Sequence, residues 1–243
     1  MQTPTAHPPL DKPTLQNRIT QHLASVAQGR VAVQRDATQH ASVLALKRFQ
    51  SARLRATYAD LHTQPRFRAG VDFFTQDLYS ERDFSQRDAD LQRIVPSISR
   101  LFPLEALAAV EAALHLHALA EQLDVQMCES AQWARDWTPA SYANAWRAVG
   151  QADLRQLQLQ LVQLTGERLD KLVRVPLINV SLRAMSAPAA LAGLSELHGF
   201  LLRGFSAFKA LGGARDFLQC INSRESALMR ELFTQYGEES KRG

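Results

Sequence analysis

The chain has 243 residues, 46% of them apolar and 21% charged, which is typical of a globular protein with a sizeable core and excludes disorder as the default. Its two cysteines, Cys128 and Cys220, stand far apart and form no C-x-x-C pair, so neither a disulfide framework nor a cysteine zinc site is expected. The net charge is +4, and residues 1–70 hold the whole surplus, with ten Lys and Arg against three Asp and Glu.

Straight-chain helix formers dominate the sequence, and β-branched residues are sparse. Apolar residues recur at steps of three and four, so an all-α structure is predicted. Thr14 and Thr138 are expected to cap helices, the latter followed by Pro139 at the first helical position. In chain order the predicted helices cover 14–30, 33–61, 65–78, 85–101, 104–123, 139–149, 154–172, 176–185, 188–211 and 214–236.

One stretch has the alternation of a strand. Leu157, Leu159 and Leu161 alternate with glutamine. The same stretch also fits one face of a helix once Leu154 and Leu164 are included, and it is poor in the β-branched residues that favour strands. A helix is therefore predicted here as well.

No internal repeat and no low-complexity linker divides the chain. Helices joined by connections this short predict antiparallel neighbours in one bundle. We therefore expect a single-domain all-α bundle of about eight to ten helices over 14–236. Disordered tails are expected at 1–13 and 237–243.

Membrane insertion is not expected. The longest uncharged stretch, 184–195, has about 12 residues and contains Pro188, whereas a membrane-spanning helix needs about 20. The N-terminal tail also lacks the apolar core of a secretory signal. These observations predict a cytoplasmic protein.

A segment dense in charged and aromatic residues lies at 73–96, around a predicted polar turn. Arg87, Asp90 and Arg93 recur at steps of three and share one helix face, where alternating charges form weak ion pairs when exposed. Ser85 and Asp88 have the spacing of a capping box. The segment is interpreted as an ion-paired corner that fixes two helices or, alternatively, as a polar pocket or partner surface. The binding candidates are Asp77, Tyr79, Asp83, Arg87, Asp88, Asp90 and Arg93.

The same segment has the pattern F-F-x-x-D-L-Y-x-x-x-D-F-x-x-R-D-x-D-x-x-R-I-x-P, starting at Phe73. A second block, G-L-x-x-L-x-x-F-L-x-x-G-F-x-A-F, starts at Gly193. Together the two blocks resemble an uncharacterised family of bacterial, all-helical proteins, and they bracket most of residues 65–235. The resemblance implies a helical fold and a bacterial origin, and it implies no activity and no catalytic residue.

The basic surplus marks a second candidate surface on the predicted helix at 33–61. Ala52 and Ala56 are assigned to its buried face, and Ser51 to its exposed face. No aromatic residues alternate with the basic ones, and no helix-turn-helix or other nucleic-acid motif is evident. An ordinary solvated face is favoured, and a surface for nucleic acid or an acidic partner is the alternative. Its basic residues are Lys47, Arg48, Arg53 and Arg55.

The seven histidines form no metal-binding pattern in the sequence. Glu111 with His115 and His117 with Glu121 are i,i+4 pairs on one helix, whereas a di-iron bundle needs Glu-x-x-His, which occurs nowhere in the chain. No metal ligand is assigned, although a single haem-binding histidine in a helical apolar pocket is compatible with the sequence. G-x-S-x-G, P-loop and G-x-G-x-x-G motifs are also missing, so no catalytic residue and no cofactor is identified.

These patterns favour a non-enzymatic binding or regulatory protein whose partner is a protein or a small ligand. A homo-oligomer is also compatible with them. The first alternative is a helical haem- or metal-binding protein, or an enzyme, with a polar site near 77–93. The second alternative is nucleic-acid binding through the basic N-terminal helices.

Overall fold

The computed structural model describes residues 11–78 and 84–234. Their regular structure is entirely helical, with twelve α-helices, ten of which have at least eight residues, and one π-helix, η1. The predicted all-α single domain is thus confirmed. No helix in these two ranges is long and apolar enough to cross a membrane. The helices are α1 (Lys12–Gln34), α2 (Ala37–Thr57), α3 (Ala59–His62), α4 (Pro65–Asp72), η1 (Phe73–Leu78), α5 (Ser85–Leu101), α6 (Leu104–Ser130), α7 (Pro139–Val149), α8 (Ala152–Leu172), α9 (Pro176–Ala184), α10 (Ser186–Leu191), α11 (Ser195–Ala210) and α12 (Arg215–Thr234).

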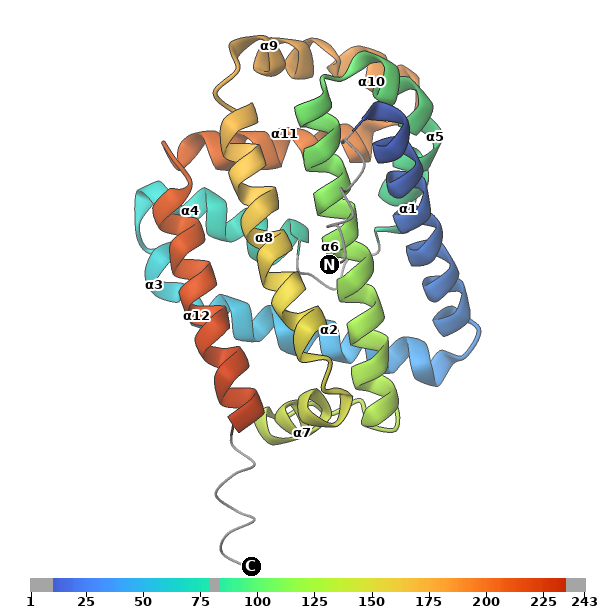
Figure 1. The fold of residues 1–243 in the computed structure, drawn as a ribbon, viewed down its shortest axis with the longest axis vertical. Helices are drawn as coiled ribbons and strands as arrows, with labels where there is room; N and C mark the ends of the chain where they lie inside the picture. Colours follow the sequence, from blue (N-terminus) through green and yellow to red (C-terminus); the bar gives the residue numbers. More distant parts are fainter. Residues whose placement is uncertain (1–10, 79–83, 235–243) are drawn as a thin grey trace, which may run out of the picture.

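Four long helices stand side by side in the order α12, α8, α6 and α1 (Figure 1). Helices α2, α4 and α11 cross behind this layer, α7 closes its lower end, and α9 and α10 cover its upper end. Consecutive helices such as α1 and α2 therefore cross, which differs from the predicted antiparallel order. The cause is local, because Asp36 accepts hydrogen bonds from the N–H groups of Thr38 and Gln39 and starts a new helix immediately after α1.

The apolar core lies between these helices in several clusters. One cluster fills the seam between α1, α5 and α6, with Leu15, Ile19 and Leu107 fully buried. A second cluster, which includes Phe208 and Phe217, lies between α4, α11 and α12. Because the seam between α1 and α6 is largely apolar, each polar side chain on it has to be satisfied by a specific partner.

Some predicted helix boundaries are confirmed and others are shifted. Thr138 caps α7, and Ser141 completes a capping box with it. Helix α8 spans the stretch of alternating leucines, as predicted. Helix α1 begins earlier than predicted, because the side chain of Asp11, not that of Thr14, caps it by accepting a hydrogen bond from the Thr14 N–H at 2.8 Å.

The predicted helix at 33–61 is divided into α2 and α3, with Tyr58 between them. Its buried face is also rotated relative to the prediction. Ser51 is buried, whereas Ala52 and Ala56 are exposed. The physical reason is that this face contributes charged side chains to the interior, where acidic groups of distant helices neutralise them.

Close contact between α8 and α12 depends on Gly166. A Cβ atom at this position would overlap the side chain of Leu218. The absence of a side chain at Gly166 therefore allows the two helices to pack closely.

Candidate functional site

The residues predicted at the 73–96 corner do not converge on one pocket in the part of the chain that the structure describes. Arg87 and Asp88 enter a buried ion cluster between helices. Asp77 pairs instead with Arg203 of α11, at 2.8 Å from Nη2. Tyr79 and Asp83 lie outside the described residues.

The buried ion cluster joins four helices. Asp88 of α5 lies 2.8 Å from Nη1 of Arg30 on α1, and its other oxygen lies 3.0 Å from Nη2 of Arg87. Glu121 of α6 lies 3.1 Å from Nη2 of Arg30 and 2.7 Å from Nζ of Lys47 on α2. None of these side chains is more than 18% exposed. The cluster comprises Arg30, Lys47, Arg87, Asp88, His117 and Glu121.

Within the buried ion cluster, one ring nitrogen of His117 lies close to both an acceptor and a donor. Its Nε2 lies 3.0 Å from Oδ2 of Asp88 and 3.1 Å from Nη2 of Arg30. If Nε2 carries a proton it donates to Asp88, and only if it is unprotonated can it accept from Arg30. The same nitrogen cannot do both, so the charge of Asp88 favours the tautomer with the proton on Nε2.

Ionisation of the cluster follows from its neighbours. Burial alone would raise the pKa of Asp88, but His117, Arg87 and Arg30 outweigh it and hold that pKa well below its ordinary value. Burial likewise opposes ionisation of Glu121, and Lys47, His117 and Arg30 lower its pKa to about 2. Both carboxylates are therefore charged at neutral pH, and the cluster ties α1, α2, α5 and α6 together electrostatically.

The predicted capping box at the start of α5 is wrong. Phe84 occupies the cap position with no side-chain hydrogen bond, and α5 begins at Ser85. Asp88 points to Arg30, Arg87 and His117 instead of turning back to the helix end. A buried charge gains more from three cationic or donor partners than from one capping bond.

Asp90 forms a smaller arrangement on the same helix. The residue is 2% exposed, and its Oδ1 accepts hydrogen bonds from Nε2 of Gln86 and from Nη2 of Arg93, at 2.8 and 3.2 Å. Arg93 also donates to the carbonyl oxygen of Ala192, next to α10. The arrangement thus connects α5 to the C-terminal end of α10. These contacts support the interpretation of the corner as structural.

The predicted basic strip is only partly on the surface. Lys47 belongs to the buried ion cluster, and Arg53 lies 3.0 Å from a carboxylate oxygen of Glu225 on α12. Arg48 and Arg55 are exposed. Two of the four positive charges are therefore neutralised internally, which leaves a smaller positive surface for nucleic acid than the sequence suggested.

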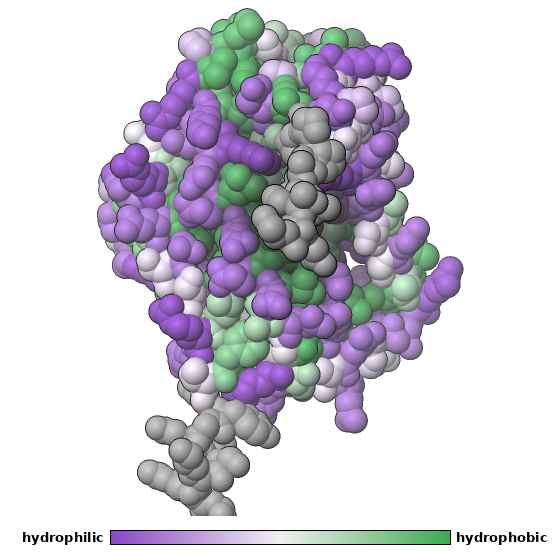
Figure 2. Space-filling view, viewed as in Figure 1, coloured by the Kyte–Doolittle hydropathy of each residue, from purple (hydrophilic) through white to green (hydrophobic). Residues whose placement is uncertain are grey.

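An exposed apolar ridge lies at the upper end of the molecule, over α9 and α10. None of the nine residues of α9 is buried. Figure 2 shows apolar side chains gathered on the surface at this end. The sequence predicted a short helix here but no function for it. The signal that could have indicated one is the abundance of apolar residues between Pro176 and Pro188. The ridge comprises Val175, Leu177, Val180, Met185 and Leu191, which are 43%, 72%, 63%, 48% and 91% exposed.

A hollow of about 550 Å³ adjoins the ridge, between α8, α9 and α11. Its apolar lining includes Val173, Val180 and Phe208, and its polar lining comprises Asp170, Arg174, Asn179 and Lys209. Arg174 is 63% exposed and pairs with Asp170 on its own helix turn at 2.8 Å. The hollow therefore combines apolar side chains with a small positive charge, because Asp170 offsets one of its two basic residues.

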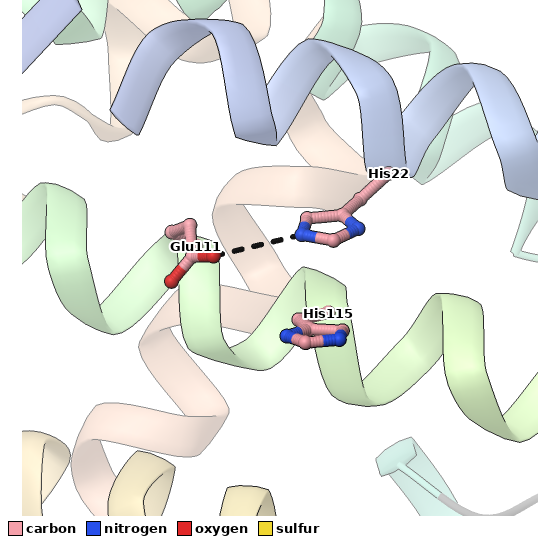
Figure 3. A group of neighbouring side chains, drawn as sticks. All are labelled: His22, Glu111 and His115. Atoms are coloured by element: carbon pink, nitrogen blue, oxygen red, sulfur yellow. Dashed lines mark ion pairs between the residues drawn. The ribbon is translucent and has the colours of Figure 1, made fainter. Parts of the chain in front are cut away.

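A second polar group lies on the seam between α1 and α6 (Figure 3). His22 projects from α1, and Glu111 and His115 project from successive turns of α6. Nε2 of His22 lies 3.5 Å from Oε1 of Glu111, and the two imidazole rings stack with centroids 4.7 Å apart. Sequence reasoning compared histidines only along one helix, so it could not find a group completed by a residue from a distant helix.

This fold defines an all-helical protein with a buried ion cluster inside and an apolar ridge outside. The chain belongs to a family described as a domain of unknown function (DUF8198), which matches residues 30–239. The expectation of an uncharacterised family is thereby confirmed, and both sequence blocks that led to it lie within the matched range. The bacterial origin stays a prediction. No curated protein and no solved structure matches the chain.

Proposed function

We propose that this chain is a non-enzymatic binding protein whose partner is another protein, bound on the apolar ridge. The observation that carries the proposal is α9, a nine-residue helix with no buried residue and with Leu177 and Val180 72% and 63% exposed. Single exposed apolar residues are common on protein surfaces, but a group of them on two consecutive helices is typical of an interaction site.

The hollow beside the ridge defines the chemistry of the partner. A segment that fills it meets Val180 and Phe208 on the floor and Arg174 and Lys209 at the margin. An amphipathic helix with apolar side chains on one face and acidic side chains beside them is complementary to both features. The proposal therefore commits to an acidic, amphipathic segment of a partner protein.

The test begins with a photo-crosslinking residue in place of Leu177 in the cells that make the protein. The crosslinked protein is then purified, and its dissociation constant is measured by calorimetry with wild type and with the double variant Leu177→Asp, Val180→Asp. The variant removes apolar contact and adds charges that repel an acidic partner, so binding is expected to weaken at least about tenfold. Both positions are exposed, so the fold should be retained.

A matched control is the double variant Gln219→Asp, Asn222→Asp on α12. Its two positions are exposed and have the same spacing as Leu177 and Val180. Both double variants replace two neutral residues by aspartate, so the change in charge is the same. Binding of this variant within about twofold of wild type is expected, since neither position belongs to the ridge or lines the hollow beside it. Equal weakening by both variants, or crosslinks only between copies of this chain with a dimer that Leu177→Asp, Val180→Asp dissociates, would refute a foreign protein partner at the ridge.

A further inference from the structure

We propose that His22, Glu111 and His115 form a binding site for one divalent cation of the zinc class, placed between α1 and α6 (Figure 3). Two imidazoles and one carboxylate are a ligand set that zinc accepts, with water in the fourth position. This inference is independent of the proposed partner-binding function, because the site is on the seam between α1 and α6 and the ridge is on α9 and α10.

The spacing of the potential ligand atoms fits a single ion. One ligand atom from each residue lies within 4.8 Å of the others. Ligands about 2.0–2.1 Å from a tetrahedral ion are roughly 3.4 Å apart. The His22 Nε2 and Glu111 Oε1 atoms are 3.5 Å apart, which is close to this spacing.

Side-chain rotation is sufficient for this movement. The two histidine rings lie nearly parallel, 13° apart, so their in-plane lone pairs do not yet converge. The χ2 torsion of histidine has a broad energy profile, and turning the rings about it costs little. Ile19 and Leu23 of α1 and Leu107 and Leu114 of α6 pack along the same seam and hold the two helices in place.

The protonation of the group suits a cation. Burial lowers the pKa of His115, which favours the neutral imidazole that metals require. The contact with His22 lowers the pKa of Glu111 and keeps this carboxylate charged, and a bound cation would displace the proton that His22 shares with it. The side chains of His22 and Glu111 are 20% and 12% exposed, so that an ion and its water can reach them from solvent.

One neighbouring charge opposes the cation. Arg18 is one helical turn before His22 on α1 and interacts electrostatically with Glu111 and His115. Its positive charge disfavours a divalent ion in the group, whereas the carboxylate of Glu111 favours one. Removing the charge of Arg18 should therefore strengthen binding of the cation, whereas removing a ligand should weaken it.

The experiment uses the full chain stripped with a chelator and titrated with Zn²⁺ by calorimetry, and separately with Co²⁺ by visible absorption. One equivalent of Zn²⁺ is expected, with tetrahedral Co²⁺ bands. His115→Ala and Glu111→Gln should weaken binding by roughly a hundredfold and abolish the bands. Arg18→Gln should strengthen binding several-fold, which the loss of a merely structural hydrogen bond would not do.

The control is His40→Ala, which removes an exposed histidine of α2 far from the group. Its affinity should equal that of wild type, and circular dichroism should show that all variants are folded. The proposal is overturned if wild type binds no stoichiometric Zn²⁺, if His115→Ala binds as wild type does, or if His40→Ala loses the site.

Discussion

The buried ion cluster and the apolar ridge reverse the usual arrangement of a globular protein in opposite ways. In the cluster, charged side chains such as Asp88 and Glu121 lie inside, and each has cationic partners within 3.1 Å. On the ridge, apolar side chains such as Leu191 lie outside, with 91% exposure and nothing among residues 11–78 and 84–234 to cover them. The charges inside are satisfied within the molecule, whereas the apolar groups outside gain only from a second molecule.

The largest effect on stability is expected from breaking the cluster at its centre. Asp88→Ala leaves Arg30 and Arg87 buried without their shared carboxylate, and loss of one partner of a buried pair costs about 3–5 kcal/mol. Urea denaturation measures the change. Asp216→Ala is the control, because its ion pair with Arg66 is exposed and should contribute at most about 1 kcal/mol. Similar losses of unfolding free energy in Asp88→Ala and Asp216→Ala would show that a buried ion pair contributes no more than an exposed one.

Acid should weaken the cluster next. The pKa of Glu121 falls from 4.5 to about 2 in the folded chain, and that of Asp88 is lowered as well. A carboxyl group with a lowered pKa stabilises the fold above its unfolded pKa, and this contribution is lost as the pH falls through the folded value. The free energy of unfolding should therefore drop between about pH 4.5 and 2, by on the order of 3 kcal/mol for Glu121. Glu121→Gln should flatten this part of a pH series of urea melts, and an unchanged slope would contradict the assignment.

Arg155 extends the comparison, because it is a buried charge that forms no ion pair with any residue in 11–78 or 84–234. It is 3% exposed, its Nε and Nη2 have no hydrogen-bond partner among the described residues, and it stacks 3.8 Å above the ring of Trp146. Arg155→Met relieves the cost of burying the charge and loses a cation–π contact of about 0.5–2 kcal/mol. Stability should stay within about 1 kcal/mol of wild type in thermal melts. A loss as large as that of Asp88→Ala would place Arg155 with the paired charges.

The smallest effect is expected on the ridge. Leu191→Ser exchanges an exposed apolar side chain for a polar one and should change the free energy of unfolding by less than about 0.5 kcal/mol. Urea denaturation at neutral pH tests it beside Leu107→Ala, a fully buried leucine whose loss should cost about 2–5 kcal/mol. A large loss from Leu191→Ser would mean that the ridge is covered within the chain.

The helices could be predicted because their signals are local. Periodic leucines define α8, and Thr138 with Pro139 defines the start of α7. The interior charges could not be predicted in the same way. Lys47 and Arg53 have the pattern of a solvated face, since their partners Glu121 and Glu225 are on helices far away in the sequence.

The candidate sites follow the same rule. Arg87 and Asp88 are predicted as candidates because they lie in a segment dense in charged residues. The structure brings them together with Arg30, and no spacing in the sequence indicates that contact. His22 joins Glu111 and His115 only because α1 packs on α6. Local patterns thus identify part of each group, and the packing of distant helices supplies the remaining residues.

The π-helix η1 fixes the number of residues that the chain needs between α4 and the contact of Asp77 with Arg203. Its backbone hydrogen bonds span five residues, one more than those of the α-helix α4 that it continues. The side-chain hydroxyl of Thr75 within it donates a hydrogen bond to the carbonyl oxygen of Val71. Deleting one residue from η1 would restore a regular α-helix. The side chains that follow the deletion in this helix would then turn by about 100° around the helix axis. Asp77 would then face away from Arg203, and a relative one residue shorter here must build the approach to α5 differently.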